Sequence, residues 1–565
     1  MADLAAQIRH LVEQERARFD VPGCAVLVVK DGEVVLAEGF GRRDRDRDLP
    51  VTAQTLFPIG SSTKTFTAAV CASLVDEGHL EWDRPLREYL PGFRMHDPVA
   101  TELLSVRDCL SHRSGLPRHD VLWYAAAEGS LDRDDLIAAL SDLPPTKPFR
   151  QVWQYNNLLY VTAGHLAGKL SGGSFEDAVR RRLLEPLGMR RTNFSVVETQ
   201  ADADHSQPYV RAIGETETKE VPYAPLDLAG PAGSINSSLE DMTPWLLTLL
   251  GHGVDGKPQL LSDAVLADLR KPTMPLPEGT PFDVGTPVGY GLALFIEDYR
   301  GHRLTHHGGN IDGFSSQVAT IADSGVGVVV LTNLGGTSLR DALPYLIFDV
   351  LLGLDPKPHG ERLFERYQAL LTGAAQAKER HETISRSADL PPVRSLADYA
   401  GRYVHPAYGA LTVRHDDGVL LGRYQGLAEG RLEHRHLEVF DLVTYVGGED
   451  YRLPVQFTHD LEGEVDALAA KIEPMLDALR FPRQPDTAHL TDELLDRLAG
   501  TYRLGPVQAV VARRGDVELV ASIAGSEPKQ LKPVRGTTFS LDGATVEFLD
   551  DGRLITPSGD FVRST

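Results

Sequence analysis

The sequence predicts a mixed α/β (α+β) domain, with an antiparallel sheet flanked by helices and a helical insertion, followed by two small antiparallel β-barrels. Three observations predict it. Strand-like runs stand at both ends of the first part of the chain, the stretch between them is mostly helical in periodicity, and strand-and-turn patterns repeat weakly near the C-terminus. The chain has 565 residues, which is too long for one hydrophobic core and indicates several domains.

The predicted sheet begins near the N-terminus and is completed much later in the chain. Residues 24–41 hold two strand-like runs around a Lys-Asp-Gly turn, which predicts a hairpin. Helical periodicity then dominates from residue 62 to about residue 250. Strand-like runs return over residues 289–296, 314–321 and 326–333. We therefore expect an antiparallel sheet assembled from both ends of this region, with the helical insertion between them.

A proline-rich stretch with one charged helix separates this domain from the C-terminal part. Beyond it, "LADYAGRY" at 396–403 and "LDRLAGTY" at 495–502 share Leu, Ala-Gly and Tyr in register, and each precedes alternating strands with tight turns. Two small antiparallel barrels explain both copies. The expected divisions are a first domain over 1–355, a linker with a helix over 356–393, and barrels over 394–484 and 488–565.

Composition and charge exclude several classes of partner. The formal net charge is −23, so a nucleic-acid backbone or an anionic membrane would be repelled by the average surface. The three cysteines, Cys24, Cys71 and Cys109, lie in apolar surroundings with no metal-ligand spacing, which favours buried free thiols. The N-terminus lacks the apolar core of a signal peptide, and no run is long enough to span a membrane. A cytoplasmic protein is the expectation, and a homodimer is left open.

The stretch "FPIGSSTKTFTAAV" places Ser61 three residues before Lys64 at the start of a predicted helix. Residues at i and i+3 share a helix face, so a hydroxyl and an amine could meet there. The competing interpretation is a helix N-cap serine with a solvated lysine. The chain supplies its own control, since Ser526 and Lys529 have the same spacing, but an intervening Pro528 argues against a helix.

Two further short motifs follow in the chain. Tyr155-Asn156-Asn157 precedes the apolar helix predicted from residue 158; alone, the tyrosine fits a partly buried aromatic and Asn157 a helix cap. His307 precedes two glycines at the entry to a strand and, alone, is more often structural than catalytic. A metal site at His302, His306 and His307 lacks a carboxylate or cysteine at matching spacing.

Together the three motifs resemble the signature of the serine penicillin-recognising enzymes: Ser-x-x-Lys, then Tyr-x-Asn, then Lys or His-x-Gly. The segments "LSHRSGLP", "EPLGMRRTNF", "PAGSINSSLEDM" and "HHGGNIDGF" resemble the class C β-lactamase and esterase branch, over roughly residues 5–350. The trailing barrels resemble the two lipocalin-like domains of the D-aminopeptidases. The resemblance implies a catalytic domain of the β-lactamase/transpeptidase type.

The resemblance also implies roles for single residues. Ser61 would be the nucleophile that forms an acyl-enzyme, with Lys64 and Tyr155 sharing the base role. Asn157 would hydrogen-bond Lys64 and the substrate amide. Backbone N–H groups of Ser61 and of Gly309 or Asn310 would hold the oxyanion. No cofactor and no metal is implied.

His307 stands where β-lactamases and DD-peptidases carry a lysine that pairs with the substrate carboxylate. The histidine pattern is that of the family's esterases, D-aminopeptidases and D-amino acid amidases. The expected function is therefore a serine hydrolase of short peptides or amides, similar to D-aminopeptidases. The alternatives are a carboxylesterase for small esters, a peptide cyclase or acyltransferase, and, least favoured, a non-enzymatic ligand-binding protein.

The resemblance to D-aminopeptidases implies that a barrel loop restricts the active site. Residues 415–418, "HDDG", and 446–451, "VGGEDY", are the candidate loops. The alternative is that the barrels only dimerise or stabilise the protein.

Overall fold

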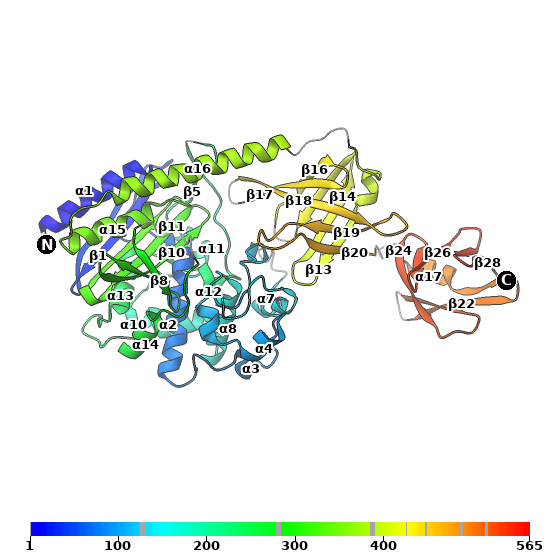
Figure 1. Ribbon diagram of the computed structural model, residues 1–565, viewed down its shortest axis with the longest axis horizontal. Coiled ribbons are helices and arrows are strands. Elements are labelled where there is room, and N and C mark those ends of the chain that lie inside the picture. Colours follow the sequence, from blue (N-terminus) through cyan, green and yellow to red (C-terminus); the bar gives the residue numbers. More distant parts are fainter. Residues whose placement is uncertain are drawn as a thin grey trace.

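A computed structural model describes residues 2–124, 131–215, 217–277, 284–384, 390–424, 427–446, 449–485, 490–514 and 518–564. In Figure 1 the helix-and-sheet domain stands at one end of the molecule, and the two barrels follow it in chain order along the long axis. This is the arrangement of elements that the sequence predicts. The domain boundaries set from the sequence stay predictions.

An antiparallel sheet of eight strands forms the centre of the first domain, in the order β3-β2-β1-β12-β11-β10-β9-β8. Its strands are β1 (Gly23–Lys30), β2 (Glu33–Asp44), β3 (Leu49–Pro50), β8 (Thr286–Tyr290), β9 (Phe295–Tyr299), β10 (His302–Ile311), β11 (Phe314–Ile321) and β12 (Val326–Thr332). β1 pairs with β12 across the chain, with Leu27 opposite Val329. The sheet is thus assembled from both ends of the domain.

Helices cover both faces of this sheet (Figure 1). On one face lie α1 (Ala2–Arg18), α15 (Leu339–Leu351) and α16 (His359–Ile384), and on the other lies α13 (Leu239–Leu250), against β1 and β12. β1 is buried on both sides: Ala25 and Leu27 belong to the core on the α13 face, and Val26 and Val28 to the core under α15. This double burial explains why β1 is an unbroken apolar run rather than an alternating one.

The helical insertion packs on the α13 face and carries two helices that matter for the site, α2 (Thr63–Asp76) and α8 (Leu158–Leu170), which are in contact. Its other helices are α3 (Leu86–Tyr89), α4 (Pro98–Leu103), α5 (Val106–Leu110), α6 (Val121–Tyr124), α7 (Arg133–Ala139), α9 (Phe175–Val179), α10 (Glu185–Leu187), α11 (Val196–Ala201), α12 (Gly230–Gly233) and α14 (Asp263–Leu269). Short strand pairs join β4 (Phe57–Pro58) to β7 (Asn236–Ser237) and β5 (Tyr209–Arg211) to β6 (Thr218–Glu220).

The C-terminal part forms two closed antiparallel barrels. The first contains β13 (Gly401–His405), β14 (Gly409–Asp416), β15 (Val419–Tyr424), β16 (Gly430–His436), β17 (Val439–Val446), β18 (Glu449–His459), β19 (Val465–Ala470) and β20 (Leu479–Gln484). After α17 (Asp492–Leu498), the second contains β21 (Gly500–Leu504), β22 (Val507–Arg514), β23 (Glu518–Ile523), β24 (Lys529–Arg535), β25 (Thr538–Leu541), β26 (Ala544–Phe548), β27 (Arg553–Thr556) and β28 (Gly559–Arg563). Closure leaves neither barrel with an unpaired edge strand.

The two barrels differ in how their cores meet the rest of the chain. The core of the first barrel, which includes Tyr408 and Phe457, belongs to the same contiguous apolar cluster as the helical insertion. The core of the second, which includes Phe539 and Phe548, is a separate cluster. The first barrel is therefore packed against the first domain.

Cys24, Cys71 and Cys109 are buried free thiols. In the described ranges, no helix has the length and apolar character needed to cross a bilayer.

Candidate active site

Ser61 lies in a single helical turn, η1 (Gly60–Ser62), that connects β4 to α2. Gly60 has φ +49°, and a Cβ there would come within 3.0 Å of the backbone nitrogen of Asn310. Glycine therefore lets the serine turn lie directly against β10. Thr63 begins α2, so Lys64 stands one turn after the serine.

Two side chains donate hydrogen bonds to the Ser61 hydroxyl. Lys64 Nζ and Tyr155 OH each lie 3.0 Å from Ser61 Oγ. Lys64 Nζ also donates to the carbonyl of Ala232 at 2.7 Å. The capping interpretation is wrong here, because neither η1 nor α2 has a side-chain cap and Lys64 is fully buried. The control pair is not brought together: Ser526 Oγ accepts from the Ile523 amide, and Lys529 pairs with Asp542.

The electrostatics favour neutral forms of both groups around Ser61. Burial, with a smaller effect from the positive charge of Arg118, holds the pKa of Lys64 well below its ordinary value. Burial raises the pKa of Tyr155 to about 12, although its hydrogen bond to Ser61 and the charge of Arg118 act in the opposite direction. The ammonium form of Lys64 would face the rings of Tyr155 and Tyr160, at 5.0 and 5.2 Å. An amine that is readily neutral therefore lies beside a hydroxyl that stays protonated.

His307 lies in the middle of β10, opposite Val318, rather than at the entry to a strand. Its Nδ1 is 2.8 Å from the carbonyl of Gly308, which can only accept, so Nδ1 carries the proton. Nε2 is buried without a hydrogen-bond partner. Burial, followed by the charge of Lys64, holds the pKa of His307 well below its ordinary value. The imidazole is therefore neutral near pH 7.

The other two histidines weighed as metal ligands, His302 and His306, contact other side chains. His306 Nε2 is 2.6 Å from Glu297 Oε1. His302 Nδ1 is 3.3 Å from Ser324 Oγ. Across the described part of the chain, no group of three or more His, Cys, Asp or Glu side chains could hold a metal ion.

Asn157 stands at the N-cap position of α8, but its side chain does not cap the helix. The predicted hydrogen bond between Asn157 and Lys64 is not formed. Asn157 Nδ2 donates to Asp120 Oδ1 at 2.8 Å, while Asn157 Oδ1 is buried without a partner. Lys64 Nζ instead donates to Ser61 Oγ and to the Ala232 carbonyl, while the Asn157 amide N–H is used by the Asp120 carboxylate. Asn157 Oδ1 is buried, so the expected contact with a substrate amide stays a prediction.

The residues expected at the oxyanion site lie beside the serine turn. A Cβ on Gly309 would come within 1.8 Å of the Ile59 carbonyl, so only glycine fits there. The Asn310 side chain accepts from Ser315 Oγ and from the Gly336 amide, so it is occupied within the sheet. The roles of the Ser61, Gly309 and Asn310 amides stay predictions.

Three charged or aromatic neighbours of Tyr155 were not predicted from the sequence. The guanidinium of Arg118 lies over the Tyr155 ring, with its carbon 4.8 Å from the centroid, and Arg118 Nε pairs with Asp120 at 2.5 Å. His112 is fully buried with its ring 4.2 Å from that of Tyr155. All three lie in or directly after "LSHRSGLP", so the motif quoted for the resemblance was the available signal.

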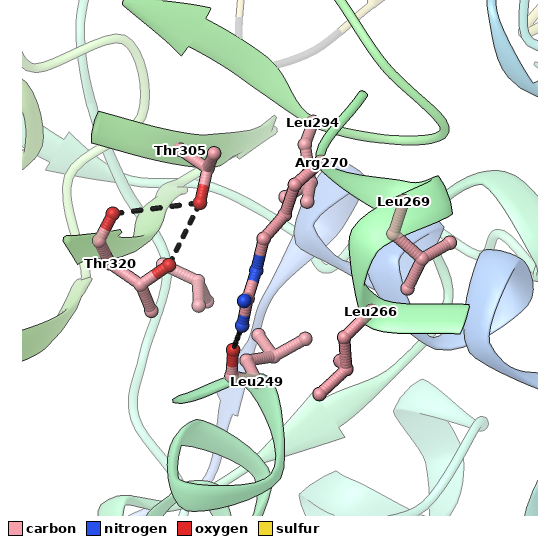
Figure 2. Close-up of a pocket in the computed structure, with 8 residues that line it drawn as sticks. Leu249, Leu266, Leu269, Arg270, Leu294, Thr305 and Thr320 are labelled. Atoms are coloured by element: carbon pink, nitrogen blue, oxygen red, sulfur yellow. Dashed lines mark hydrogen bonds between the residues drawn. The ribbon is translucent and has the colours of Figure 1, made fainter. Parts of the chain in front are cut away.

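A cavity of about 820 Å³ opens beside Ser61. Its lining includes Ser61, Tyr155, His307, Arg340 and Trp153 and extends to α16. A second cavity, shown in Figure 2, holds only about 10 Å³. There Arg270 reaches the Leu249 carbonyl and Thr305 bonds Thr320, which leaves room for about one water and no substrate.

Residues 8–352 match the family described as Beta-lactamase. The chain belongs to this family. Residues 385–483 match a family described as a domain of unknown function, DUF3471. The unguisins hydrolase ungD' of Aspergillus campestris is 30% identical over 419 residues, covering 72% of this chain and 77% of the relative. The unguisins hydrolase ungD of Aspergillus violaceofuscus is 29% identical over 81% of this chain and 86% of its own. Family and relatives identify this chain as a hydrolase.

Two solved structures place the fold. The D-amino acid amidase from Ochrobactrum anthropi SV3 is 25% identical, with a TM-score of 0.51, over 62% of this chain and 98% of its own. The octameric penicillin-binding protein homologue from Pyrococcus abyssi has a TM-score of 0.55 at 23% identity, over 84% of this chain and 98% of its own. The predicted fold of a β-lactamase-type domain followed by two barrels is confirmed.

Proposed function

We propose that the protein is a serine hydrolase that cleaves short peptides or amides through an acyl-enzyme, in the manner of a D-aminopeptidase or D-amino acid amidase. The observation that carries the proposal is the pair of 3.0 Å hydrogen bonds that bring Lys64 and Tyr155 onto one hydroxyl, that of Ser61. A serine hydroxyl needs a neighbour that takes its proton before it can attack a carbonyl.

Lys64 is the base in this mechanism. Its buried amine has a lowered pKa and is already in contact with Ser61 Oγ, whereas the raised pKa of Tyr155 keeps the phenol protonated. In the neutral amine the hydrogen bond between these atoms runs from the Ser61 O–H to Nζ, and Lys64 takes this proton as Oγ bonds to the carbonyl carbon. Tyr155 then delivers a proton to the leaving amine, and water hydrolyses the acyl-enzyme by the reverse sequence.

Two features of the cavity support an amide or peptide without a required carboxylate. His307 is neutral, so the position offers no permanent cation to pair with a carboxylate. The cavity of about 820 Å³ is within the range that holds small-molecule ligands. The D-amino acid amidase likeness also favours an amide over an ester.

Hydrolysis of D-alanine p-nitroanilide, L-alanine p-nitroanilide and p-nitrophenyl butyrate, side by side, tests the proposal. The variants are Ser61→Ala and, as a matched control, Ser526→Ala, which removes the serine of the accidental second Ser-x-x-Lys. We expect turnover of the D-anilide by the wild type and by Ser526→Ala, and none by Ser61→Ala. Turnover of the ester alone would move the assignment to the esterases, and equal rates for wild type and Ser61→Ala would refute the mechanism.

A further inference from the structure

Residues 118–120 lie between the candidate active site and the first barrel. Arg118 and Asp120 face the site, and His119 between them is 1% exposed and bonded to the barrel. His119 has φ +52°, in the left-handed region that a residue with a side chain rarely adopts. A backbone held in that region needs surrounding contacts that enforce it.

The first barrel supplies those contacts through two buried residues. Glu473 Oε2 accepts from the His119 amide at 2.8 Å, and Tyr408 OH lies 2.6 Å from His119 Nδ1. Both are fixed within the barrel, because the Tyr408 carbonyl accepts from Tyr424 OH and Glu473 Oε1 accepts from the Met475 amide. The barrel therefore holds His119 by hydrogen bonds to its backbone amide and to its imidazole ring.

The expected gating loops are not the ones that make these bonds. Among the described residues, 415–418 form no hydrogen bond to the first domain, and part of 446–451 lies outside the described residues. The contact is instead made by Tyr408, before β14, and by Glu473, between β19 and β20.

On the other side of the loop, the residues next to His119 contact the side chains around Ser61. Arg118 lies over the Tyr155 ring, and Asp120 both pairs with Arg118 and accepts from Asn157. The charge of Arg118 lowers the pKa of Lys64 and that of Tyr155, in each case as a smaller effect than burial. A displacement of His119 would therefore move two groups that contact the catalytic side chains.

We propose that Tyr408 and Glu473 are positioning residues for the hydrolytic site: the first barrel holds His119 so that Arg118 stays over Tyr155 and Asp120 stays bonded to Asn157. The proposal rests on the proposed function for its kinetic readout. It assigns the barrel a part in turnover that mere stabilisation of the fold would not give.

Tyr408→Phe and Glu473→Met, in the full chain, remove the two contacts while keeping side-chain size. We expect kcat on the D-anilide to fall about tenfold with KM changed less. Glu473→Gln keeps an acceptor for the His119 amide and should restore most of the rate. Matched controls inside the same barrel are Tyr403→Phe, whose hydroxyl donates to the Tyr399 carbonyl, and Glu464→Gln, whose carboxylate pairs with Arg394; both should stay within about twofold of wild type.

The pH profile separates positioning from general loosening. Groups that act on Tyr155 and Lys64 are Arg118, Asp120 and Arg340, while His112 and His307 beside them have lowered pKa values and are neutral. Displacing the Arg118 charge raises the pKa of Lys64, the base of the proposed mechanism, so the acidic limb of kcat should move up by about half a pH unit in Tyr408→Phe. In an Arg118→Gln background, Tyr408→Phe should add no further shift. An unmoved limb, or equal losses in both backgrounds, would overturn the proposal.

Amide hydrogen exchange at His119 measures the strength of its contact with the barrel without any substrate. Peptides that contain His119 should exchange at least about tenfold faster in Glu473→Met than in wild type. Their exchange rate should be the same in Glu464→Gln as in wild type. If no substrate is turned over above the Ser61→Ala background, the proposed function fails, but the exchange result still shows whether the barrel holds His119. Unchanged exchange at His119 in both Tyr408→Phe and Glu473→Met would refute it.

Discussion

The two barrels share one fold and differ in what they touch. In each, the tyrosine of the repeat donates its hydroxyl to the backbone carbonyl four residues earlier, at 2.7 Å: Tyr403 to Tyr399, and Tyr502 to Leu498. Yet the first barrel shares a core with the helical insertion and grips His119, whereas the second has a core of its own. The common motif therefore specifies the barrel, and residues outside the motif specify the contact.

Part of the difference lies in one hairpin. In the first barrel residues 406–408 connect β13 to β14 and include Tyr408, while in the second only Gly505 and Pro506 connect β21 to β22. The shorter turn has no aromatic side chain to present. The contact of Tyr408 with His119 therefore comes from a connection between strands, outside the motif that the two barrels share.

The largest effect should come from a region that neither barrel supplies. Lys64→Met removes the amine while filling the same buried space, so we expect kcat to fall by about 10³-fold or more. Thermal stability should be equal or higher, because a buried amine is replaced by an apolar group. Steady-state kinetics and thermal unfolding together check this. A loss of activity accompanied by unfolding would show a structural role for Lys64 instead.

Truncating one core aromatic in each barrel tests the comparison directly. Phe457→Ala in the first barrel and Phe548→Ala in the second each remove a buried ring and should each lower the free energy of unfolding by about 3–5 kcal/mol. Only Phe457→Ala should also lower turnover, because only that core is continuous with the insertion. Calorimetry and rates on the folded variants provide the measurement. Equal kinetic losses in the two variants would contradict the division drawn between the barrels.

Acidification should weaken the contact between the first barrel and His119 of the first domain. Burial lowers the pKa of His119 to about 4, so between its ordinary value of 6.5 and about 4 the unfolded chain binds a proton that the folded chain does not. Stability is therefore full above about pH 6.5 and falls as the pH drops, by up to about 3 kcal/mol. Residues 490–565 contain no histidine, so the second barrel lacks this dependence. Unfolding of wild type and His119→Gln across this range checks it: the buried His112 and His307 keep part of the dependence in both proteins, so we expect a smaller loss of stability in His119→Gln, and an equal loss would contradict the prediction.

The sequence predicted the sheet and the barrels well because both depend on patterns within short stretches of sequence. The apolar runs of β1 and β12, the turn glycines and the Leu, Ala-Gly, Tyr repeat each act within a few residues. The meeting of Ser61 and Lys64 also follows from a helix period. Tyr155 and His307 could be named only through the resemblance, because their approach to Ser61 depends on the packing of α8 and β10.

What the sequence could not predict is decided by pairings across long distances in the chain. The hydrogen bond from Asn157 to Asp120 depends on a loop whose course is set by the barrel more than 280 residues later. The same holds for Arg118, since no periodicity places a guanidinium over a tyrosine ring. Such contacts need the tertiary structure, because each partner alone resembles an ordinary surface residue.

The smallest expected effect separates fold from function most cleanly. Tyr403→Phe and Tyr502→Phe each delete one buried hydrogen bond of the shared motif, so each should lower the stability of its own barrel by about 1 kcal/mol. Turnover should stay unchanged in both, in contrast to Tyr408→Phe, which deletes one hydroxyl from the same barrel as Tyr403. Because Tyr403 and Tyr408 are both fully buried, burial does not distinguish them. If Tyr403→Phe slowed turnover as much as Tyr408→Phe, the barrel would act through its stability alone, and the contact to His119 would have no separate role.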